Sequence, residues 1–424
     1  MMRFSRDKLY RFSDAVIEYA FYLLLFALPF AKALVETAAT LMIVGWFGKR
    51  LLVCLAAKSS FGERLRLCRP VQTYLNLPLT IYLCAVALSV FLSSNHALSI
   101  KSFFFKTFEY ILLFFITAEL IKDRKRLART IGVMLVSATM VGLDSVLQQL
   151  VGFDILRHYP LEAQRSTGSF QMPGSLGGYM GPLALIVLAL VFLRFTRKVR
   201  YLLRLLALLL LGVLVTTFSR GAWLGFTVGA LFLGLLENKK IVFTVLAILA
   251  IFALVLPMVI NTPYSVVERL KSFSFSASSA NLDRQTIWKI ALTMIKDRPV
   301  FGYGLNTFMG TFVRYGEEFT AYKIQGIVPY AHNCYLQIAA ESGIVGLLSF
   351  LFLIGTFFLR SIISLRSFKK GFAHAVLAGV SAGICATLAH SAVDTNLYSL
   401  QLAVLFWCLL GINAALQRGV SFEE

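Results

Sequence analysis

The chain has 424 residues, of which 58% are hydrophobic and only 15% are charged. Soluble domains carry roughly 45–50% apolar and about 25% charged residues, so a mean hydropathy of +0.76 excludes an ordinary water-soluble enzyme. It also excludes an intrinsically disordered chain, because disorder requires low hydrophobicity. The composition therefore predicts an all-α polytopic membrane protein, and the net charge of +20 must be explained within that class.

Apolar runs long enough to cross a bilayer as helices recur along the whole chain. The basic N-terminus leads into the first run without a small-residue cleavage site, so we expect no cleavable signal peptide. We predict one integral membrane domain over residues 1–424, with twelve spans at 14–31, 33–48, 74–93, 103–121, 130–151, 173–193, 201–218, 221–236, 241–260, 333–359, 372–391 and 396–416.

The basic residues predict the orientation of these spans. Twenty-seven of the 41 Lys and Arg residues fall in connections on the side of the N-terminus. Eight of the remaining 14 lie in the long segment 261–332, where the positive-inside bias does not operate. We therefore expect both termini in the cytoplasm, since the number of spans is even. The basic excess then reflects orientation and affinity for anionic membrane lipids, and not binding to nucleic acid.

Two segments on the external face lie outside the spans: a smaller loop, 152–172, and a large loop, 261–332. These are the predicted periplasmic loops if the membrane is a bacterial inner membrane. Any chemistry is expected at this face, because the polar and titratable residues that do not serve orientation gather there.

A helix is predicted within the large loop. Asn281 or Asp283 can cap a helix that starts near Arg284 and stops at Asp297. Apolar residues recur between these ends at helical spacing. The pattern predicts an amphipathic helix that lies on or against the bilayer, with Trp288 near the headgroups.

Two arginines are candidates for binding an anion. Arg220 follows Ser219, which can cap the eighth span, and an Arg beside a helix N-terminus suits a phosphate. The alternative is an Arg that extends to the outer interface. Arg284 stands in the first turn of the predicted loop helix, where a cation is unfavourable unless an anion lies between it and the helix dipole. Its alternative partner is a local carboxylate such as Asp283.

His332 lies at the external start of the tenth span and is the candidate general base. An imidazole has an unperturbed pKa of about 6.5, which suits proton transfer near neutral pH. The alternative is a helix cap or an interfacial residue. Arg165, in the smaller loop, could add another cation. His390 and Asp394 are four residues apart, so the carboxylate could orient that imidazole or support the main site.

Other polar residues are given structural interpretations. Glu341 lies inside a span and is costly there unless it is paired, but its spacing makes it no obvious partner of His332. Lys106 and Glu109 are spaced to pair along one helix.

The six cysteines are interpreted as small core residues and not as disulfides, and neither they nor the histidines show metal-site spacing. No Walker A loop, GxGxxG or HExxH motif is present. We expect neither a metal nor a cofactor.

Three parts of the chain resemble the O-antigen ligase family, the membrane glycosyltransferases related to O-antigen polymerases. They are SRGAW at 219–223, DRQTIW at 283–288 continuing through DRP to FGYG at 301–304, and AHNCYL at 331–336 with ESGIVG at 341–346. The resemblance implies a GT-C-like helical fold that acts at the periplasmic face of a bacterial inner membrane.

The resemblance also implies roles for single residues. Arg220 and Arg284 would bind the diphosphate of an undecaprenyl-diphosphate-linked glycan, and His332 would contact the acceptor hydroxyl as the base. In the ligases the acceptor is a sugar of the lipid A core. Asp394 resembles an external acidic position of the ligases. The expected reaction is a metal-independent transfer that inverts the anomeric carbon.

Two alternatives remain open. The first is another transferase of the same superfamily: an O-antigen or capsule polymerase, or a protein O-oligosaccharyltransferase. The second is a flippase or other transporter of a lipid-linked glycan, which should need charged residues lining a path through the membrane. No oligomeric state follows from the sequence.

Overall fold

The computed structural model describes residues 2–56, 69–237, 243, 247, 279–320 and 330–418. Within these ranges every regular element is helical, and extended pairing is limited to two isolated bridges in the smaller loop. The predicted all-helical class is confirmed. The N-terminal half contains α1 (Met2–Ala27), α2 (Lys32–Ala56), α4 (Asn76–Phe91), α5 (His96–Ser102), the π-helix η1 (Phe103–Phe108), α6 (Glu109–Leu120), α7 (Arg124–Val151), α8 (Pro173–Val191) and α9 (Arg197–Thr216).

The C-terminal half contains α10 (Arg220–Leu236), α13 (Ser279–Asp297), α14 (Phe308–Thr320), α15 (Cys334–Ser367), α16 (Phe372–Ser391), the 3-10 helix η2 (Asn396–Tyr398) and α17 (Leu400–Leu416). Six helices are long and apolar enough to cross a membrane: α2, α7, α8, α9, α15 and α16. Eleven predicted spans overlap described helices, whereas 241–260 lies outside the described residues apart from two positions. The count of twelve therefore stays a prediction.

The core of the bundle is formed by α8, α16 and α17, which are buried on nearly all sides. Small residues let the backbones of α10 and α16 come close together, as is common where helices associate in membranes. A Cβ added at Gly225 would lie 2.4 Å from the Ala386 carbonyl oxygen, and one at Gly229 would lie 2.7 Å from that of Ala382. Together with Gly221, where an added Cβ would lie 2.7 Å from Cδ2 of His390, these contacts hold the start of α10 against the end of α16.

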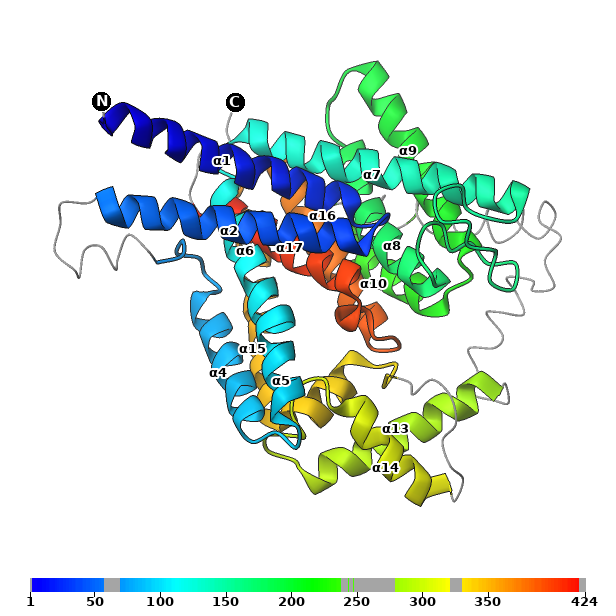
Figure 1. The fold of residues 1–424 in the computed structure, drawn as a ribbon. Coiled ribbons are helices and arrows are strands. Elements are labelled where there is room, and N and C mark those ends of the chain that lie inside the picture. The colour runs from blue at the N-terminus through cyan, green and yellow to red at the C-terminus, as the bar shows by residue number, and fades with distance from the viewer. Residues whose placement is uncertain are drawn as a thin grey trace.

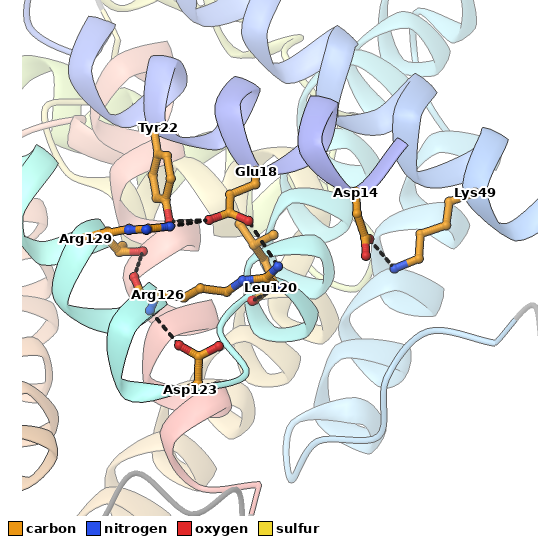
Figure 2. A network of polar contacts seen from close by, with 9 residues as sticks. Asp14, Glu18, Tyr22, Lys49, Leu120, Asp123, Arg126 and Arg129 are labelled. Carbon is orange, nitrogen blue, oxygen red and sulfur yellow. Dashed lines mark hydrogen bonds and ion pairs between the residues drawn. The ribbon is translucent and has the colours of Figure 1, made fainter. Parts of the chain in front are cut away.

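Salt bridges join the helices at one end of the bundle. Lys49 of α2 lies 2.6 Å from Asp14 of α1, and Glu18 of α1 lies 3.0 Å from Arg126 of α7 (Figure 2). These carboxylates and cations are partly or fully buried, so each pair also removes an unpaired charge from an apolar environment. We call this the salt-bridged end.

The C-termini of α15 and α17 also lie at the salt-bridged end of the bundle. Ser364 donates to Gln417 at 2.8 Å, and Arg418 donates to the Ala118 carbonyl oxygen at 2.7 Å. Arg50 of α2 pairs with Glu119, the neighbour of Ala118, at 2.6 Å. Helix ends that the charge count assigns to one side of the membrane therefore do meet in space. Which side faces the cytoplasm stays a prediction.

The cysteine expectation is wrong at one position. Cys54 is disulfide-bonded, although we interpreted it as a small core residue. Cys84, Cys334, Cys385 and Cys408 are free, and two of them are fully buried.

The large loop contributes α13 and α14, which lie below the main bundle in Figure 1. α13 begins at Ser279, so Asn281 and Asp283 fall inside the helix and the predicted cap is wrong, whereas its end at Asp297 is confirmed. Trp288 donates from its indole nitrogen to the Ala331 carbonyl oxygen at 2.9 Å.

The apolar face of α13 packs against protein. Ile290 and Met294 are buried in a cluster with Phe308 and Phe312 of α14. The expectation that this face lies on the bilayer is wrong, because the following helix and the start of α15 cover it.

Candidate active site

The start of α15 is separated from the rest of that helix by a break at Gly343, where φ is +67° and ψ is −174°. Backbone groups at such a break lose their helical partners and need others. Residues 299–304 supply them. The Ile344 amide donates to the Pro299 carbonyl at 2.8 Å, and the Gly304 amide donates to the Glu341 carbonyl at 2.8 Å.

This docking accounts for two glycine-containing motifs that carry the family resemblance. A Cβ added at Gly343 would lie 2.1 Å from the Val300 carbonyl oxygen, and one at Gly302 would lie 2.5 Å from the Glu341 carbonyl carbon. Both glycines also have positive φ. FGYG and ESG are therefore two halves of one backbone contact, which fixes the half-helix 334–342.

His332 lies immediately before this half-helix. The cap of α15 is Asn333, whose side-chain oxygen accepts from the amides of Tyr335 and Leu336 at 2.9 and 3.0 Å. His332 therefore does not cap the helix. Its backbone is left-handed, with φ +48°, a conformation that costs a non-glycine residue roughly 1–3 kcal/mol. Its Nδ1 lies 3.5 Å from Oδ1 of Asp394.

Asp394 lies between two imidazoles. Its Oδ2 is 3.6 Å from Nε2 of His390, a side chain that is only 2% exposed. Burial alone would raise the pKa of Asp394, but the contacts with His332 and His390 and the amide of Thr395 lower it further than burial raises it. From the sequence, Asp394 could either orient His390 or support the main site at His332. In the structure it contacts both histidines.

The first turns of α8 and α10 pack against this group. The predicted Ser219 cap is confirmed, with its hydroxyl accepting from the Ala222 amide at 3.3 Å. A Cβ added at Gly221 would lie 3.0 Å from Nε2 of His390, and one at Gly174 of α8 would lie 3.0 Å from Oδ2 of Asp394. Arg220, between Ser219 and Gly221, thus belongs to a turn that contacts His390.

The other two predicted arginines lie on neighbouring segments. Arg165 donates from Nε to the Thr217 carbonyl at 2.9 Å, which lays the smaller loop against the connection before Arg220. Arg284 stands one helical turn before Trp288, whose indole donates to the carbonyl just before His332. Since α13 begins at Ser279, Arg284 lies beyond its first turn, and the helix-dipole argument for it is wrong.

Sequence reasoning missed a chain of hydrogen bonds through Glu341. Gln337 accepts from the Ala331 amide at 3.1 Å and donates to Glu341 at 3.3 Å, and Tyr398 donates to the other Glu341 oxygen at 3.2 Å. Glu341 is not a direct partner of His332, as expected. The i,i+4 spacing of Gln337 and Glu341 could have indicated the link, because such pairs face each other on a helix.

Comparison with known proteins bears on this region. Residues 205–351 match the family model described as O-antigen ligase. This part of the chain is therefore similar to the O-antigen ligase family. The matched range contains Arg220, Arg284 and His332, whereas His390 and Asp394 follow it.

A relative is found in Rickettsia conorii, a protein provisionally named a polysaccharide ligase. It is 28% identical over 174 residues, which cover 39% of this chain. The chain aligns with 41% of the length of that relative.

Proposed function

We propose that the protein is a metal-independent, inverting glycosyltransferase. It would move a glycan from undecaprenyl diphosphate to a sugar of the lipid A core, at the periplasmic face of the bacterial inner membrane. The observation that carries the proposal is the contact of His332 with Asp394, a half-buried carboxylate that also contacts His390 beside the turn of Arg220. The similarity of residues 205–351 to the O-antigen ligase family supports the same class of reaction.

His332 would act as the base. As the acceptor oxygen attacks the anomeric carbon of the donor, its proton passes to the imidazole. Asp394 orients the ring through Nδ1 and stabilises the imidazolium that forms, which leaves Nε2 to face the acceptor. The left-handed backbone of His332 is held by the cap of the next residue and by the docked α13.

Arg220, Arg284 and Arg165 would hold the diphosphate. The bond between the anomeric carbon and the bridging oxygen breaks, and its electron pair leaves on undecaprenyl diphosphate. Guanidinium groups and the positive end of the α10 helix dipole would stabilise that charge. The new bond forms on the opposite face of the sugar, so a single displacement inverts the anomeric configuration.

Reconstitution in liposomes tests the proposal. Purified protein receives a lipid-linked glycan either with lipid A core or without it, each in the presence and absence of EDTA. We expect glycan on lipid A core only when both substrates are present, at a rate that EDTA does not change.

Three other results would contradict the proposal. Longer glycans on the lipid carrier, formed without core, would indicate a polymerase. Glycan that changes leaflet without a new bond would indicate a transporter. Activity that EDTA abolishes and a divalent ion restores would overturn the metal-free mechanism.

A further inference from the structure

A second polar site lies beside the start of α15, away from Asp394. It is a cavity of about 90 Å³ bounded by η1, α15, η2 and α17. Lys106 and Asn306 form a half-buried rim, and Glu341, Phe406 and Trp407 form a buried floor. A cavity of this size has room for several water molecules, so it is a site for a small polar group and not for an extended chain.

The rim is built by irregular backbone. Lys106 and Thr107 belong to the π-helix η1, a rare widened turn that is frequent at functional sites. Lys106 does not form the pair with Glu109 that its spacing predicts; it reaches across to donate to the Asn306 side chain at 3.3 Å. Asn306 itself has a left-handed φ of +59°. Both polar groups are thus turned toward the cavity.

The chemistry of the lining indicates a neutral, hydroxylated ligand. One carboxylate, Glu341, and one ammonium group, Lys106, face the cavity, so it has no excess of positive charge for a phosphate. Tyr82, Tyr110 and Trp407 add aromatic surface. A sugar ring combines an apolar face, which packs on aromatic rings, with hydroxyls that donate to carboxylates and accept from ammonium and phenol groups.

The cavity lies within reach of the candidate base. Cys334, Ile338 and Glu341 share one face of α15. Cys334 donates to the Asp394 carbonyl at 3.4 Å, whereas Ile338 and Glu341 line the cavity. Seven residues separate Cys334 from Glu341, which is roughly 10 Å of helical rise. That distance corresponds to one or two sugar units.

We propose that this cavity is a subsite for one sugar residue of the glycan substrates, bound by Glu341, Tyr398 and Lys106. This inference rests on the proposed transferase function. The sugar can come from the donor glycan or from the acceptor core, because both present the same chemistry, and the experiment separates the two sources.

The test uses the full-length protein in nanodiscs. Binding of two soluble oligosaccharides, the glycan without its lipid diphosphate and the core without lipid A, is measured by saturation-transfer NMR. The variants are Lys106→Met and Glu341→Gln, with Tyr398→Phe as a milder change that removes one hydroxyl. Lys101→Met, on the exposed side of α5, is the matched control.

We expect wild type and Lys101→Met to bind one oligosaccharide, and the cavity variants to bind it at least about 10-fold more weakly, as loss of a hydrogen bond to a charged group predicts. In the transfer assay the same variants should raise KM for the matching substrate more than they lower kcat. Unchanged binding in folded variants, or no binding by wild type, would overturn the subsite. Sugar binding that depends on the cavity without any transfer would instead refute the proposed function alone.

Discussion

Charged side chains are paired at different distances at the two ends of the helical bundle. At the salt-bridged end, Lys49 and Asp14 approach to 2.6 Å and Arg126 and Glu18 to 3.0 Å. At the other end, Asp394 stands 3.5 and 3.6 Å from its two imidazoles. Among the described residues, Nδ1 of His332 and Nε2 of His390 are buried without a hydrogen-bond partner, as is Nδ1 of His374 near the opposite end of α16. The first arrangement fixes helices, whereas the second retains hydrogen-bonding capacity that a bound substrate can organise.

Strained backbone conformations are also distributed unequally between the two ends. Within the described ranges, the non-glycine residues with positive φ all lie in loops on the His332 side, and two of them are His332 itself and Phe218, two residues before Arg220. Strained backbone of this kind is concentrated at functional sites, where the surrounding structure holds it in place. The helices of the salt-bridged end carry no such residue in the described part of the chain. The contrast predicts that substitutions at one end affect rate and those at the other affect stability.

The largest effect is expected for His332→Ala. Loss of a positioned base lowers a rate by about 10²–10⁴-fold, and the variant should still insert in the membrane and bind the lipid-linked donor. The measurement is initial rate of transfer in the reconstituted system. His96→Ala, an exposed histidine of α5, is the matched control and should transfer normally. Wild-type rates in His332→Ala would remove the base assignment.

Arg220→Lys should follow, with a loss of about 10²–10³-fold, the usual cost of removing one group that stabilises charge in the transition state. An ammonium group keeps the charge but cannot reproduce the two-pronged contact of a guanidinium with phosphate. Arg314→Lys, at an exposed position of α14, supplies the control. If Arg220→Lys transfers glycan as fast as Arg314→Lys, Arg220 serves only as an anchor at the membrane surface.

A smaller effect is expected for Asp394→Asn. The amide keeps the shape but loses the charge that orients and stabilises the imidazole. We expect a loss of about 10–100-fold, the range seen when a carboxylate that orients a metal-bound histidine is removed. Because the pKa of Asp394 is lowered, the carboxylate is charged throughout the neutral range. The variant should therefore be slower than wild type by a similar factor from about pH 7 to 9, since the wild-type carboxylate stays ionised across that range. A deficit that disappears within that range would contradict this role.

Sequence alone predicted the helical class, which the structure confirms, because apolar runs are a local signal. The count of twelve spans and the roles of His332, Asp394 and Arg220 stay predictions. Sequence reasoning failed where partners are distant along the chain. Nothing local shows that residues 299–304 dock at a break in α15, or that Lys106 reaches Asn306 instead of Glu109. The wrong start of α13 has a related cause, because residues with good capping side chains are also tolerated inside a helix that tertiary contacts stabilise.

The smallest effect on rate is expected at the salt-bridged end, with Glu18→Gln. Glu18 accepts from Tyr22 at 2.9 Å and pairs with Arg126 and Arg129 (Figure 2). Removing its charge leaves Arg126, whose side chain is only 22% exposed, without its carboxylate. We expect a loss of about 1–3 kcal/mol in the free energy of unfolding, measured by thermal unfolding in nanodiscs. Transfer per folded molecule should not change. Asp394→Asn should show the reverse, with a large loss of rate. If both variants lost rate and stability together, the two ends of the bundle would not have separate roles.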